Sequence, residues 1–144
     1  MAIQGFGNVA QPMAQFLIEK NVASIVATDI SADAVKVADD MKARGTGSTT
    51  LDVSLVEMGD NSVLFDADAD IVAPSAWGGI LNDDTIPHIK APIICGAANN
   101  MLLDPEGDAA IAKQGQTYVY TCTGCAEDNR MTHDVRLQFM EYIM

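Results

Sequence analysis

Short apolar runs alternate along the chain with segments whose apolar residues recur at helical spacing. The apolar runs predict strands at residues 2–4, 24–28, 49–53, 70–74, 92–96 and 117–121. The helical spacing predicts helices at residues 9–20, 32–43 and 105–113, a short helix at 86–89 and a last one at 128–143. Residues 54–66 show no clear pattern. Strand–helix alternation of this kind is typical of an α/β fold of the Rossmann type, a doubly wound parallel sheet with helices on both faces.

The ends of several predicted helices are marked by residues that suit helix ends. Ser31 is placed to cap the helix at 32–43, and Asp104 followed by Pro105 suits the start of the helix at 105–113. Asp83 or Asp84 would cap the short helix. The apolar faces of the first two helices are expected to be buried; they comprise Val9, Met13, Phe16 and Leu17, and then Ala34, Val35, Ala38 and Met41.

The first predicted strand runs into a turn with the pattern G-x-G-x-x-A, which opens a helix. Gly5 permits the tight turn, and Gly7 has no Cβ, so that a pyrophosphate can approach the backbone. Ala10 is small enough to let the helix pack closely on the strand. The N–H groups at the start of the helix, near Asn8, would bind the phosphates. The pattern predicts a dinucleotide site; the alternative is a small-residue turn that binds no ligand.

An acidic residue, Asp29, follows the second predicted strand, at the position where dinucleotide-binding folds carry the acidic residue that binds the ribose. Its carboxylate can accept a hydrogen bond from a ribose 2′-OH and would repel a 2′-phosphate. No Arg or Lys lies between Asp29 and Ala34 to attract such a phosphate. The sequence therefore favours NAD over NADP.

Composition narrows the class of protein. The 144 residues are expected to form a single domain, 1–144, and the net charge of −12 argues against nucleic acid or an anionic membrane surface as a partner. No apolar run approaches a membrane span, and the chain does not open like a signal peptide. Three cysteines fit a reducing, cytoplasmic setting better than a disulfide scaffold.

Four loops follow predicted strands and would converge at the carboxyl edge of the sheet, where such folds bind ligands. These loops are Gly5–Ala10, Asp29–Ser31, Ala73–Trp77 and Gly96–Asn100. In the third loop, Trp77 would either cover a ring of the cofactor or pack into the core.

Three stretches together resemble one family. They are residues 2–10 (AIQGFGNVA), 70–82 (DIVAPSAWGGILN) and 89–100 (IKAPIICGAANN). They resemble the NAD-binding domain of the glutamate/leucine/phenylalanine/valine dehydrogenases, closest to the leucine and phenylalanine branch. Members of this family oxidatively deaminate an L-amino acid to a 2-keto acid and pass a hydride to NAD.

The resemblance implies roles for particular residues. Gly5, Gly7, Asn8 and Val9 would hold the pyrophosphate, and Asp29, with Ile30 beside it, the adenosine ribose. The cofactor cleft would be lined by Ala73, Pro74 and Ser75. One of Asn99 and Asn100 would face the nicotinamide ribose and the substrate; the alternative is that both are turn residues that tolerate a left-handed backbone.

The sequence also departs from this family. Nothing here corresponds to the separate domain that carries the family's catalytic lysines and aspartate, and residues 121–127 (TCTGCAE) stand where the family has an Asn-Ala-Gly-Gly loop. We therefore expect a cofactor site without catalytic residues, and no turnover by the lone chain; an amino acid or 2-keto acid would bind only with a domain supplied in trans. The alternative is a non-catalytic NAD-binding module or a truncated remnant, self-associating as a homo-oligomer. The apolar face of the last helix would either pack on the chain's own sheet or serve this self-association.

Two cysteines, Cys122 and Cys125, form a C-x-x-C pair. This spacing is used by zinc sites and redox sites, but no second pair is present and only Cys95, His88 and His133 could complete a metal site. We expect ordinary residues here, with no metal, and the two histidines as surface or capping groups.

Overall fold

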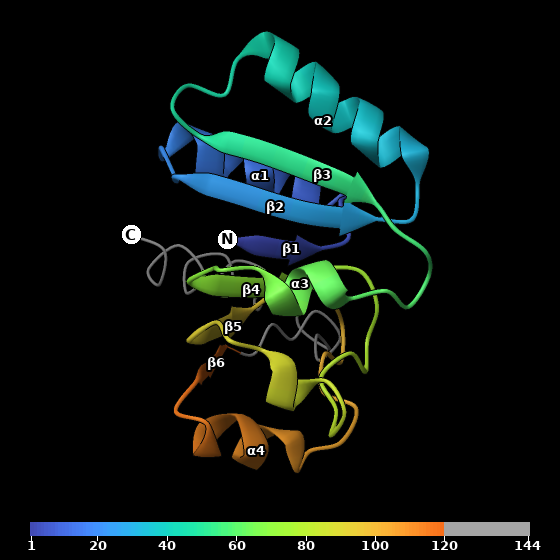
Figure 1. Cartoon of the computed structure of the whole chain (residues 1–144), viewed down its shortest axis with the longest axis vertical. Helices are drawn as coiled ribbons and strands as arrows, with labels where there is room; N and C mark the ends of the chain where they lie inside the picture. Colours follow the sequence, from blue (N-terminus) through green and yellow to red (C-terminus); the bar gives the residue numbers. More distant parts are fainter. Residues whose placement is uncertain (120–144) are drawn as a thin grey trace, which may run out of the picture.

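The strands form one six-stranded parallel sheet in the order β3-β2-β1-β4-β5-β6 (Figure 1). The structure, a computed structural model, describes residues 1–119 except the side chains of residues 63 and 64. The strands are β1 Ala2–Gln4, β2 Ser24–Asp29, β3 Thr50–Leu55, β4 Ile71–Pro74, β5 Ile93–Cys95 and β6 Thr117–Val119. Every pair of neighbours is parallel. The predicted Rossmann-type fold is confirmed.

The short strand β1 lies at the centre of the sheet, and all of its residues are buried. Ala2 pairs with Val26 of β2 on one side and with Val72 of β4 on the other. The chain builds outward from β1 in one direction through β3 and then crosses back to β4. This reversal is a topological switch point, the place where parallel sheets of this type bind ligands.

One face of the sheet is covered by α1 (Ala10–Glu19) and α2 (Ala32–Arg44). The predicted buried face of α2 is confirmed at Ala34, Ala38 and Met41. The predicted face of α1 is wrong at Val9, whose side chain is 55% exposed. Val9 precedes the helix, in the turn. The prediction is confirmed at Leu17, Met13 and Phe16 are half-buried, and α1 also buries Ala10, Ala14 and Ile18.

The other face carries α3 (Ser62–Asp66), the 3-10 turn η1 (Ile86–His88) and α4 (Gly107–Lys113). Figure 1 shows α1 behind β2 and β3, whereas α3 lies in front of the sheet. A second apolar cluster fills this side around Val72, Ile94 and Ile111. Helices therefore cover both faces, as the alternation of strands and helices predicts.

Two predicted helix ends differ from the structure. The short helix is capped by neither Asp83 nor Asp84: the Asn82 side chain accepts hydrogen bonds from the N–H groups of Asp84 and Thr85 instead. Asn82 thus fixes the turn that precedes η1, and η1 itself has no side-chain cap. The later helix begins at Gly107 because Asp104 starts a turn, in which its C=O accepts from the Gly107 N–H.

One further helix prediction is confirmed, and another falls on residues that the structure does not describe. Ser31 caps α2 as expected, because its side chain accepts from the Asp33 N–H. The last predicted helix, with the self-association face placed on it, lies outside the described residues, and so does the end of the predicted strand at 117–121.

We predict that Gly96→Ala is strongly destabilising. A Cβ at Gly96 would lie 2.0 Å from the backbone oxygen of Pro74, and that oxygen is held by the Ala98 N–H. The free energy of unfolding should fall by about 2 kcal/mol or more, measured by urea denaturation. Gly7→Ala is the control, because a Cβ there meets no atom within 4 Å. Equal midpoints for the two variants would contradict this packing.

Candidate cofactor-binding site

The turn after β1 is locked between two neighbouring segments at Gly5. Its φ of +84° lies in the region that favours glycine. Its N–H donates to the Thr28 oxygen of β2 at 2.8 Å, and an added Cβ would lie 2.6 Å from the Ala76 Cβ. Gly5 is therefore required both by the turn and by the close approach of the loop after β4.

The next residues of the turn are open to solvent. Gly7, Asn8 and Val9 are exposed, and nothing lies within 4 Å of the position that a Gly7 Cβ would take. The first turn of α1 contains no acidic residue, and Val9 at its N-cap makes no side-chain capping bond. An uncapped helix start at the carboxyl edge offers N–H groups and a positive dipole end to an anion.

The carboxylate of Asp29 connects two of the loops. One oxygen accepts a hydrogen bond from the Phe6 N–H at 2.6 Å, and the other accepts from the Ser31 N–H at 2.8 Å. Asp29 thus lies beside the glycine turn and the start of α2. Ile30, the next residue, is 45% exposed at the same edge.

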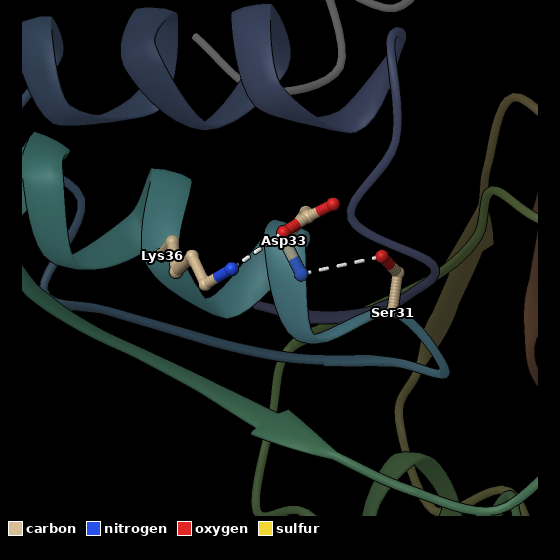
Figure 2. A network of polar contacts seen from close by, with 3 residues as sticks. All are labelled: Ser31, Asp33 and Lys36. Atoms are coloured by element: carbon tan, nitrogen blue, oxygen red, sulfur yellow. Dashed lines mark hydrogen bonds and ion pairs between the residues drawn. The ribbon is translucent and has the colours of Figure 1, made fainter.

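The start of α2 holds a small polar network (Figure 2). The Asp33 N–H donates to the Ser31 hydroxyl at 3.3 Å, and the Lys36 ammonium contacts the Asp33 carboxylate at 2.8 Å. Both charged side chains are largely exposed, so this pair adds little stability. The pair does determine where Lys36 points: this lysine, the first cation after Asp29 in the sequence, is turned toward Asp33.

The loops after β4 and β5 are joined by backbone hydrogen bonds. The Ser75 N–H donates to the Gln4 oxygen at 2.7 Å, the Ala98 N–H to the Pro74 oxygen at 3.0 Å and the Gly79 N–H to the Asn100 oxygen at 2.7 Å. The structure thereby brings the first, third and fourth predicted loops together at one edge.

The structure places Ala73 and Pro74 at the carboxyl end of β4, an inner strand, with both side chains fully buried. Their place beside the cofactor stays a prediction, and it would involve backbone atoms rather than these side chains. Ser75, the first residue after β4, is half-buried, so part of its surface is accessible to a ligand.

The two asparagines differ in backbone conformation. Both are exposed, but Asn100 has a φ of +49°, in the left-handed region, and Asn99 does not. Asn100 thus fits the turn interpretation.

The exposed large hydrophobic side chains among residues 1–119 occur at the carboxyl ends of strands or in the loops that follow them. Trp77 is 57% exposed, so the interpretation that it packs into the core is wrong. The others are Val9, Ile30, Leu55, Met58 and Leu103. Each lies at or beyond the carboxyl end of a strand, so the edge that carries the glycine turn also carries apolar surface.

The structure adds residues that the sequence did not single out. Gln4, on β1, is buried and donates from its amide to the Asn61 side chain at 3.2 Å. The Gln11 amide donates to the Phe6 oxygen at 2.9 Å. In the sequence, these residues stand out only as a glutamine within an apolar strand and a glutamine in the first turn of α1. Neither feature predicts a role in the site unless the hydrogen-bond partner is known.

Two cavities lie at the opposite edge of the sheet. They measure about 490 and 300 Å³ and share the segment Asp66–Ala69, which leads into β4. The first is bordered by Lys90, whose ammonium is 3.6 Å from the Asp66 carboxylate. Both are distant in the fold from the glycine turn, because they border the amino ends of the strands.

No group of three or more His, Cys, Asp or Glu within residues 1–119 is placed to hold a metal ion. His88 is exposed, as expected, whereas Cys122, Cys125 and His133 lie outside the described residues. In the same part of the chain, no helix is long and apolar enough to cross a membrane.

A family model described as glutamate/leucine/phenylalanine/valine dehydrogenase matches residues 1–126. The chain belongs to this dehydrogenase family. It is 37% identical over 117 residues to phenylalanine dehydrogenase of Bacillus thermotolerans, covering 81% of this chain and 28% of that protein. It is 36% identical over 119 residues to leucine dehydrogenase of Bacillus subtilis, covering 82% of this chain and 29% of that protein.

Solved structures of dehydrogenases resemble the fold. L-tryptophan dehydrogenase from Nostoc punctiforme matches with a TM-score of 0.63 at 33% identity, over 82% of this chain and 32% of that one. A hetero-hexameric glutamate dehydrogenase from Thermus thermophilus matches with a TM-score of 0.61 at 19% identity, over 98% and 34%, which supports the fold alone. The chain spans less than a third of the length of the curated relatives named above.

We predict that the Cys95 thiol of this dehydrogenase homologue is unreactive when the chain is folded. Burial raises the pKa of Cys95 to about 12, so almost no thiolate forms at pH 8. A variant with Cys122→Ser and Cys125→Ser should release no thionitrobenzoate from Ellman's reagent until urea is added. Rapid release from the folded variant would contradict the burial of this side chain.

Proposed function

We propose that this chain is the NAD-binding domain of an amino-acid dehydrogenase of the leucine and phenylalanine branch. The observation that carries the proposal is the open turn at Gly7–Val9, followed by the uncapped start of α1 and joined by Asp29 to β2. A pyrophosphate needs close backbone approach and N–H donors, and the first turn of α1 carries no acidic side chain.

The remaining parts of the cofactor follow from the order of the strands. Adenosine would lie over β2 and β3, with its ribose at Asp29 and apolar contact from Ile30. Nicotinamide would lie on the other side of the switch point, near Ser75 and Asn99, with Trp77 as an exposed aromatic surface. Gly5 would shape the turn rather than touch the ligand, since its added Cβ would meet Ala76.

The same residues favour NAD over NADP. A 2′-phosphate would approach the Asp29 carboxylate, and the second carboxylate of Asp33 lies on the first turn of α2. Lys36 could offset this charge, but it is paired with Asp33 (Figure 2). The two carboxylates repel a phosphate at this position, and the Lys36 ammonium is already paired with Asp33.

The proposed reaction is the oxidative deamination of an L-amino acid to a 2-keto acid and ammonia. When bound, NAD supplies the acceptor for the hydride that leaves the amino acid Cα. The role of this chain is to bind and orient the cofactor. The amino acid would be held with residues beyond those described here, supplied by a further domain. We also propose that the chain associates with such a domain or with a second copy of itself.

We predict that the chain binds NAD and that Gly7→Ala abolishes binding without loss of stability. The added Cβ meets no protein atom, so it fills only the space that the pyrophosphate would use. Calorimetric titration should give an affinity for NAD at least tenfold higher than for NADP, about 1.4 kcal/mol. Urea denaturation should give the same midpoint for the variant and the original chain.

Absence of NAD and NADP binding by a folded chain would refute the cofactor role. Equal binding of NAD by the Gly7→Ala variant would show that the ligand lies somewhere other than the turn.

A further inference from the structure

The two peptide groups that flank the Phe6 Cα are both held by side chains. The Phe6 N–H donates to the Asp29 carboxylate at 2.6 Å, and the Phe6 C=O accepts from the Gln11 amide at 2.9 Å. The Phe6 side chain is fully buried, and Phe6 lies between the two glycines of the turn. The orientation of these two peptide groups therefore determines how the backbone from Gly5 to Gly7 is presented.

We propose that Asp29 is a positioning residue for the pyrophosphate in addition to its contact with the ribose. Its carboxylate holds the glycine turn in the conformation that receives a diphosphate, and this inference rests on the proposed function. Asp29 would thus affect a part of the ligand that it does not touch.

The geometry of the carboxylate supports this role. Its two oxygens are divided between the loops, with one on Phe6 of the glycine turn and the other on Ser31 at the start of α2. Hydrogen bonds from N–H groups to an ionised carboxylate are stronger than those between neutral groups. With the adjacent bond from the Gly5 N–H to Thr28, consecutive residues of the turn are fastened to the end of β2.

Electrostatics alone predicts the opposite effect of removing Asp29. A diphosphate is an anion, so loss of a nearby negative charge should strengthen its binding. Loss of the positioning bonds should weaken it, because the Phe6 N–H would lack its partner and the turn would relax. The sign of the change therefore separates the two effects.

The test uses ADP and 2′-deoxy-ADP, which differ only in the ribose hydroxyl that Asp29 would contact. Titration calorimetry of the original chain, Asp29→Asn and Asp29→Ala measures both affinities. We expect Asp29→Ala to bind 2′-deoxy-ADP about tenfold more weakly than the original chain does. Asp29→Asn should lose less, because its amide oxygen can still accept one of the two bonds.

The matched control is Asp33→Asn. Asp33 lies on the first turn of α2 and carries the same charge, but its carboxylate binds the exposed Lys36 rather than the glycine turn. Its removal should leave the affinity for 2′-deoxy-ADP unchanged or slightly higher. A loss equal to that of Asp29→Ala would show that the effect does not depend on the bonds between Asp29 and the glycine turn, and it would overturn the proposal.

Two further outcomes decide the proposal. If Asp29→Ala lowers the affinity for ADP only to that of 2′-deoxy-ADP and leaves 2′-deoxy-ADP binding intact, Asp29 contacts the ribose and does nothing more. Amide hydrogen exchange gives a reading without ligand: the Phe6 amide should be protected in the original chain and exchange at least tenfold faster in Asp29→Ala, which can accept neither bond.

The exchange measurement also separates this proposal from the proposed function. If the original chain binds neither diphosphate, the cofactor role fails, and Phe6 exchange still shows whether Asp29 holds the turn. Fast exchange of Phe6 in the original chain would overturn the positioning role, even where Asp29→Ala does not fold.

Discussion

The parallel pairing of β1 with β2 on one side and β4 on the other is the constraint on which the site depends. Three residues, Ala2–Gln4, supply this central strand, and they are buried on both faces. Because the chain must cross back to place β4 beside β1, the loops after these strands separate at one point of the carboxyl edge. The glycine turn lies at that point, and its position follows from the topology rather than from the glycines.

Close backbone contact then joins the loops around this point. Cβ atoms at Gly5, Gly78 and Gly96 would meet Ala76, the Asn99 oxygen and the Pro74 oxygen respectively, each at 2.6 Å or less. Gly7 is the contrast, because it faces open space. The glycines of this edge thus serve different purposes: some allow the loops to pack together, and Gly7 leaves room for a ligand. The sequence pattern alone treats them alike.

Much of the fold could be predicted because its signals are local: apolar runs gave the strands, and helical spacing gave α1 and α2 to within a few residues. Predictions failed where contacts across the sheet decide the outcome. Val9 fits a helical stripe but lies in the turn before α1, where its side chain is exposed. The hydrogen bonds that Asp29 accepts from the Phe6 and Ser31 N–H groups join residues that periodicity cannot pair.

The most direct test of the account is an amide NMR spectrum of the labelled chain recorded during titration with NAD. The account predicts that the resonances of residues 6–10, 30 and 31 shift together, while those around Asp66–Ala69 do not. Shifts confined to Asp66–Ala69 would place the ligand in the cavities at the opposite edge. That result would contradict a cofactor site at the glycine turn.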